Sequence, residues 1–184
     1  MIVVLIASAV AISLRFLPQP TLNFSAMGAL ALLCGAAVRP VWLGLLVPLA
    51  CRAITDGVLQ YRTGHGFYGS IMFDYCAYAA VVAIGRTVAP KQLPTVVGTG
   101  VLAAVTFFTI SNFGVWCMPH DGQYLYAHTM SGLVECFVNA VPFAKGTFLG
   151  DIGFSLAFFG ILNLFAAKSR SAETVELTAY PKSI

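Results

Sequence analysis

Long apolar runs, separated by short stretches that hold most of the charges, divide this chain into segments. The runs are Met1–Leu14, Phe24–Val38, Val41–Gln60, Gly69–Gly85, Pro94–Met118 and Gly132–Ala167. A helix needs about 20 residues to cross a hydrocarbon core about 30 Å thick. The fifth run meets this length unaided, whereas the first, second and fourth need their polar flanks to complete them. The pattern predicts an all-α, polytopic membrane helix bundle with about six transmembrane helices.

The last apolar run is too long for a single crossing of the membrane. We predict that it is broken near Pro142–Gly146 into a short re-entrant or interfacial segment and a spanning helix over Thr147–Ala167. Residues 1–167 then form a single transmembrane domain. The polar remainder, Lys168–Ile184, is predicted to be a disordered cytoplasmic tail.

Composition supports the membrane interpretation, because 59% of the residues are hydrophobic and only 9% are charged. A soluble domain of this size needs a polar surface that such a sequence does not supply. A charged side chain in the hydrocarbon core costs several kcal/mol, which explains why most charges fall between the runs. We therefore expect the lipid bilayer to surround the chain, and we expect no nucleic-acid partner.

The distribution of basic residues predicts an orientation. With six crossings, one side of the membrane, that of the termini, receives Arg39, Arg86, Lys91, Lys168, Arg170 and Lys182. The opposite side receives only Arg15 and Arg62. Positively charged residues are enriched in cytoplasmic loops. The sequence thus predicts a multi-pass protein of the inner (plasma) membrane with both termini in the cytoplasm.

A few polar residues lie inside the apolar runs, where lipid would penalise them. Arg52 and Asp56 are four residues apart, which places them on one face of a helix. They can form a structural ion pair that fixes helix packing, or they can line a polar cavity. Both interpretations stay open, since ionisable residues within a membrane are candidates for function.

Other candidates lie near the predicted outer ends of the spans. Asp74 could extend to the outer surface or contact a ligand. Tyr75 shares a helical face with Tyr78, as an aromatic pocket wall requires, although an aromatic belt at the interface explains both. Asn112 needs a hydrogen-bond partner from a neighbouring helix or a ligand, and Trp116 suits the membrane interface.

Glu135 and Asn139 are four residues apart in the last run and share a face. We predict no metal and no cofactor. The five cysteines lie within apolar runs without metal-binding spacing, and the His/Asp/His set of the Pro119–Ser131 loop fits no standard site. The sequence has no Walker A motif.

The chain resembles a family of small bacterial membrane proteins, DUF6580, whose function is uncharacterised. The resemblance lies in Arg15–Pro20, Asn23–Ser25, Ala29–Ala36, Thr55–Gly57, Ser111–Trp116, Asn139–Phe143 and Gly150-Asp151. That family is similar to the substrate-binding S components of energy-coupling-factor (ECF) vitamin transporters. The similarity implies six helices, cytoplasmic termini, a ligand site near the outer face and a separate ATPase and coupling module. Ala7–Ala11 resembles the small-residue spacing with which some S components dock onto that module, and Leu17–Asn23 would lie over the site.

The leading hypothesis is a membrane subunit that binds a vitamin-like small molecule and takes part in its uptake, rather than an enzyme. Its predicted polar ligand contacts are Asp56, Asp74, Asn112, Glu135 and Asn139, with Tyr75 and Trp116 as apolar walls. One alternative is an intramembrane enzyme that pairs Asp74, Glu135 or Asp151 with an outer-loop histidine. Another is a scaffold that packs against a partner protein.

Overall fold

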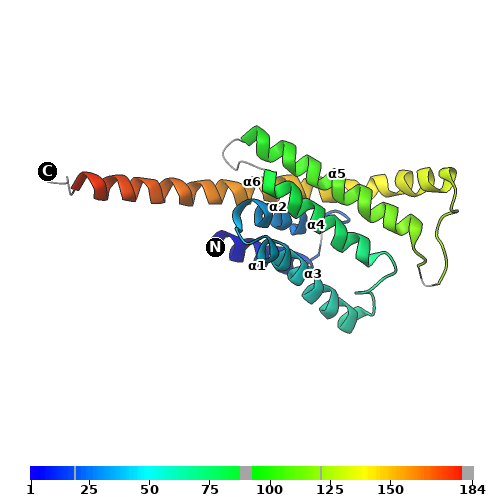
Figure 1. Ribbon diagram of the computed structural model, residues 1–184. Coiled ribbons are helices and arrows are strands. Elements are labelled where there is room, and N and C mark those ends of the chain that lie inside the picture. The colour runs from blue at the N-terminus through cyan, green and yellow to red at the C-terminus, as the bar shows by residue number, and fades with distance from the viewer. Residues whose placement is uncertain (19, 88–92, 121, 180–184) are drawn as a thin grey trace.

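The computed structural model describes residues 1–18, 20–87, 93–120 and 122–179. Six helices follow the predicted apolar runs (Figure 1): α1 Ile2–Leu14, α2 Met27–Ala37, α3 Val41–Thr63, α4 Ile71–Thr87, α5 Leu93–Cys117 and α6 Met130–Ala179. Within the described residues, β pairing is limited to an isolated bridge between His120 and Gln123. The prediction of an all-α bundle is confirmed. Lys91 and Lys182, which the charge-based orientation uses, lie outside the described residues.

The surface of the bundle exposes many large apolar side chains, whereas several charged side chains are buried inside it. Leu5, Trp42 and Leu164 are 64%, 66% and 72% exposed, whereas Asp56 and Asp151 are buried. This arrangement reverses that of a soluble protein and suits a bilayer. Three helices, α3, α5 and α6, are long and apolar enough to cross a membrane on length and composition alone, and α1 and α2 are shorter.

Helix α2 forms the centre of the bundle. Every residue of Met27–Gly35 is buried, and α2 contacts each of the other five helices. Helices α2 and α4 pack backbone against backbone where each has a glycine. A Cβ atom on Gly35 would lie 2.2 Å from the carbonyl oxygen of Val82, and a Cβ atom on Gly85 would lie 2.3 Å from the carbonyl oxygen of Leu32. Small residues of this kind let helices pack closely without a hydrophobic driving force from water.

The small residues of helix α1 pack against other helices of the same chain. Ala7 and Ala11 are fully buried, and α1 contacts α2, α3 and α6. The expectation that Ala7–Ala11 would dock onto a partner protein is therefore wrong. The two alanines instead allow α1 to lie close to its neighbours, and larger apolar residues such as Leu5 occupy the exposed face.

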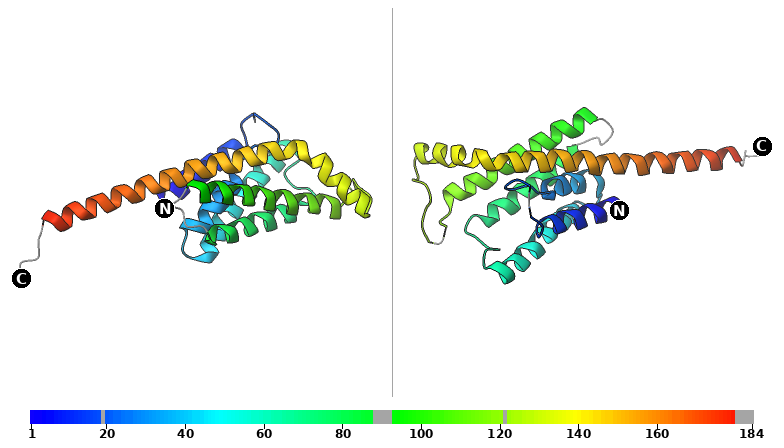
Figure 2. Two further views of the ribbon diagram at one scale, coloured as in Figure 1. Left: turned by 90° about the horizontal axis from the view of Figure 1, so that it is seen from above. Right: turned by 180° about the vertical axis from the view of Figure 1, so that it is seen from behind.

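Helix α6 is continuous over 50 residues, so the predicted break near Pro142–Gly146 is wrong. Figure 2 shows that the helix bends in its first part instead of ending. Pro142 removes one hydrogen bond and bends the helix, but the residues on both sides keep helical geometry. Helix α6 also runs on to Ala179, through most of the segment from Lys168 for which the sequence predicts a disordered tail. No glycine or proline interrupts this stretch, so the formed helix extends without a new nucleation step. Residues 180–184 lie outside the described residues.

Candidate functional site

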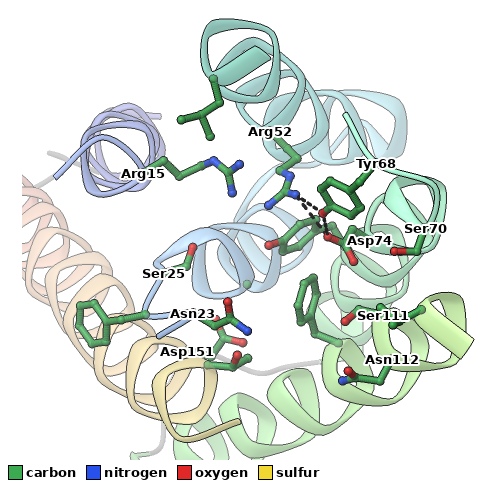
Figure 3. A pocket seen from close by; sticks show the side chains of 17 residues that line it. Arg15, Asn23, Ser25, Arg52, Tyr68, Ser70, Asp74, Ser111, Asn112 and Asp151 are labelled. Atoms are coloured by element: carbon green, nitrogen blue, oxygen red, sulfur yellow. Dashed lines mark hydrogen bonds and ion pairs between the residues drawn. The ribbon is translucent and has the colours of Figure 1, made fainter. Parts of the chain in front are cut away.

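A cavity of about 470 Å³ lies at the end of the bundle where α1 and α3 finish and α2 and α4 begin. Small-molecule sites are commonly of this size, roughly 300–1,000 Å³. Figure 3 shows its polar side chains, which come from different elements and point toward a common space. They are Arg15, Asn23, Ser25, Arg52, Tyr68, Ser70, Asp74, Ser111, Asn112, Thr147 and Asp151. The apolar lining includes Phe24, Tyr78 and Phe107.

A second cavity of about 180 Å³ adjoins the first between α5 and α6. Both cavities are lined by Asn23, Asn112 and Thr147, so they meet at these side chains. The smaller cavity continues along α6 to Asn139. Together they form a polar space within an otherwise apolar bundle.

Asp56 is the centre of a buried ion network beside the larger cavity. Its Oδ1 atom lies 2.6 Å from Nη2 of Arg15, and its Oδ2 atom lies 2.8 Å from Nε of Arg52. The hydroxyl of Tyr75 donates a hydrogen bond of 3.0 Å to Oδ2. Asp56 is fully buried, whereas Arg15 and Arg52 also line the cavity. The predicted Arg52–Asp56 ion pair is confirmed.

The same network continues from Arg52 to α4. Nη2 of Arg52 lies 3.2 Å from Oδ2 of Asp74 and donates a 2.7 Å hydrogen bond to the hydroxyl of Tyr68. Tyr68, in the connection before α4, in turn donates its hydroxyl proton to Asp74. Burial raises the pKa of Tyr68, outweighing the opposing effect of Arg52. The phenol therefore stays protonated and keeps its role as donor.

Burial also lowers the pKa of Arg15, and the positive charge of Arg52 adds to this effect. The nearby Asp56 opposes both effects. A guanidinium stays charged in proteins. Two buried cations are thus held close together by the carboxylate between them.

The carboxylate of Asp151 caps the N-terminal end of α2. The first N–H groups of a helix have no partner within it. Here the N–H of Met27 donates to Oγ of Ser25 at 3.1 Å, and the N–H groups of Gly28 and Ala29 donate to the Asp151 carboxylate. Gly28 leaves room for this contact, because a Cβ atom there would lie 2.3 Å from a carboxylate oxygen of Asp151 and would displace it. The carboxylate lines the larger cavity.

Two glycines on α6 let the α1–α2 connection lie directly on that helix. A Cβ atom on Gly146 would lie 1.9 Å from the carbonyl oxygen of Leu22, and one on Gly150 would lie 2.2 Å from that of Ser25. The glycines are four residues apart and therefore share a face. They hold Asn23 and Ser25 in place at the cavity.

The residues predicted to bind a ligand fall into three groups. Asp74 and Asn112 line the larger cavity, and Asn112 and Asn139 line the smaller one. Asp56 and Tyr75 belong to the ion network beside the cavity. Asn112 also donates from Nδ2 to the carbonyl oxygen of Phe108 at 2.7 Å, which supplies part of the hydrogen bonding that its burial requires.

Trp116 and Glu135 do not line either cavity. Trp116 donates from Nε1 to the carbonyl oxygen of Ala127 at 2.9 Å, and its ring lies 5.3 Å from that of His128. Trp116 thus ties the α5–α6 connection to the end of α5. Glu135 is exposed on α6, whereas the adjacent Cys136 is buried.

Sequence reasoning placed the loops Leu17–Asn23 and Tyr61–Tyr68 around the ligand but did not single out Arg15, Tyr68 or Asn23 as site residues. These residues lie in connections, where no periodicity relates them to a helix face. Asp151 was considered only for the enzyme alternative. Its position between apolar residues, in a run long enough to cross a membrane, could have marked Asp151 as a site residue.

The histidines, which the enzyme alternative requires, do not line either cavity. His128 contacts the carbonyl oxygen of Trp116 at 3.0 Å and packs against Tyr124. Among the described residues, no group of three or more His, Cys, Asp or Glu side chains could hold a metal ion. Asp121 of the predicted His/Asp/His set lies outside the described part of the chain.

Comparison with known proteins identifies a family for this chain. Residues 1–174 match the model of a family described as a family of unknown function, DUF6580. The match covers nearly the whole chain, including every residue of both cavities. No curated protein and no solved structure matches the chain.

Proposed function

We propose, on the basis of the larger cavity, that this chain, which belongs to the DUF6580 family, binds a small polar molecule and takes part in the uptake of that molecule. The observation that carries the proposal is the group of charged side chains, Arg15, Arg52, Asp74 and Asp151, that line a cavity inside an apolar bundle. Placing such groups at membrane depth is costly, and they usually mark a pathway or a binding site.

The location of the cavity agrees with capture from outside the cell. It lies at the end of the bundle opposite the α2–α3 connection that carries Arg39, and the basic residues favour that connection as cytoplasmic. The chain would be the binding and translocation subunit in the inner membrane. A separate ATPase and coupling module would supply the energy, in the manner of the S components that the sequence resembles.

Binding is tested by thermal unfolding of purified protein in the presence of vitamins and their precursors. A ligand at 100 times its dissociation constant adds about 2.7 kcal/mol to the free energy of unfolding, which raises the melting temperature visibly. We expect at least one compound of the panel to do so. A flat panel with well-folded protein would contradict the proposal.

A matched pair of variants tests whether binding occurs in the cavity. Thr147 lines both cavities, whereas the Thr99 hydroxyl donates to the carbonyl oxygen of Thr95 in its own helix. Thr147→Val is expected to weaken ligand binding by about fivefold, since a net hydrogen bond contributes about 1 kcal/mol. Thr99→Val should leave the dissociation constant unchanged. Equal effects of the two substitutions would place the ligand elsewhere.

The orientation gives a separate prediction. Leu125 is exposed in the α5–α6 connection, and Arg39 is exposed in the α2–α3 connection. In intact cells a membrane-impermeant maleimide should label Leu125→Cys, whereas Arg39→Cys should react only after permeabilisation. The wild type measures the background from the native cysteines. The reverse labelling pattern would show that the cavity faces the cytoplasm.

A further inference from the structure

The charges around the larger cavity do not balance. Arg15 and Arg52 are matched by Asp56 and Asp74, which lie within 3.2 Å of them. These four side chains form a neutral group on one side of the cavity. None of the ion pairs between described residues includes Asp151.

Asp151 is 3% exposed, and its hydrogen-bond partners among the described residues are the backbone N–H groups of Gly28 and Ala29. The start of a helix carries a partial charge equivalent to about half an elementary charge, so α2 offsets only part of the carboxylate. Buried charges in proteins are normally paired. The cavity is therefore left with a carboxyl group, Asp151, that lines its interior with no cationic side chain paired to it in the described residues (Figure 3).

The surroundings of Asp151 favour an organic cation over a metal ion. A metal ion needs several ligands, and among the described residues no group of three or more His, Cys, Asp or Glu side chains could hold one. The cavity also has aromatic walls at Phe24, Tyr78 and Phe107. Aromatic faces attract organic cations and pack against apolar groups.

We propose that the ligand of this cavity is an organic cation: a small molecule whose positively charged nitrogen pairs with Asp151 and whose apolar body packs against Phe24 and Phe107. The inference rests on the proposed function and names the class of molecule that the site takes. Ser111 and Asn112, which also line the cavity, are available for polar groups at the other end of the ligand.

The test uses three probes that share a phenyl body and differ in charge: 2-phenylethylamine, 2-phenylethanol and 3-phenylpropionate. Dissociation constants are measured by calorimetry on the purified full-length protein. We expect the amine to bind at least tenfold more tightly than the alcohol or the acid. In Asp151→Asn, which keeps an oxygen to accept from the α2 N–H groups, the amine should lose this advantage. Glu135→Gln removes an exposed carboxylate from the same helix and should leave it intact.

The outcomes separate this inference from the proposed function. Equal or tighter binding of the acid or the alcohol overturns the organic-cation inference, and so does a preference that survives in folded Asp151→Asn. If that variant does not fold, the preference of the wild type decides. If the probes do not bind but a vitamin or precursor does, the charge of that compound decides. A neutral or anionic compound overturns the inference, and a cationic compound supports it. If neither the probes nor the vitamin panel bind, both proposals fail.

Discussion

Asp56→Ala is expected to lower the free energy of unfolding by about 3–5 kcal/mol, the usual cost of removing one partner from a buried ion pair. The substitution leaves Arg15 without its carboxylate and leaves Arg52 with Asp74 alone. Both arginines are largely buried, with side-chain exposures of 17% and 6%, so bulk water compensates poorly for the lost partner. The loss is measured by thermal or denaturant unfolding of the detergent-solubilised protein.

Two further variants identify the cause of the loss. Tyr75→Phe removes one hydrogen bond to Asp56 and keeps the ring, so it should cost only about 1 kcal/mol. Arg15→Gln in the Asp56→Ala background removes the stranded charge and should recover part of the stability, since residues of one network are energetically coupled. If Asp56→Ala unfolds within about 1 kcal/mol of the wild type, the network does not stabilise the bundle in the way proposed.

Gly150→Ala is expected to destabilise the protein by about 1–3 kcal/mol, as overpacking does, and to abolish ligand binding. The new Cβ atom would lie 2.2 Å from the carbonyl oxygen and 3.0 Å from the nitrogen of Ser25. Because these are backbone atoms, the α1–α2 connection must move away from α6. Asn23 and Ser25 would then leave the cavity lining.

Gly153→Ala is the matched control, since it makes the same chemical change three residues later on α6. A Cβ atom on Gly153 has no neighbour within 4 Å. Alanine favours a helix over glycine by about 1 kcal/mol, so this variant should be as stable as the wild type or slightly more stable. Calorimetry and thermal unfolding check both variants. Similar losses for the two would mean that close packing at Gly150 is not the cause.

The helices were predictable because the bilayer imposes long uncharged segments. The run Pro94–Met118, for example, became α5 over Leu93–Cys117. The region around Pro142 was misjudged for a physical reason. Proline rules describe the local loss of one hydrogen bond, whereas the continuity of α6 also depends on packing along α5.

The site was predictable only where its residues share a helix. The 3.6-residue period brings Arg52 to Asp56, but no local rule brings Arg15 to a carboxylate 41 residues away. Helical periodicity predicts that two residues share a face, but it does not predict whether that face contacts a cavity, another helix or the surroundings of the bundle. Glu135 and Asn139 share a face of α6, and only Asn139 lines a cavity. The meeting of Asp151 with α2 depends on glycines at positions 28 and 150, whose effect appears only in three dimensions.

The short length of α2 determines the depth in the membrane at which a molecule in the cavity is bound. Its 11 residues rise about 16 Å, which is about half of a hydrocarbon core about 30 Å thick. Arg39 follows its C-terminal end closely and belongs at a membrane surface. The N-terminal end of α2, where Asp151 is bound, therefore lies close to the bilayer midplane. In the proposed orientation, a molecule that reaches Asp151 has passed the outer half of the permeability barrier, and only the layer occupied by α2 itself separates it from the opposite side.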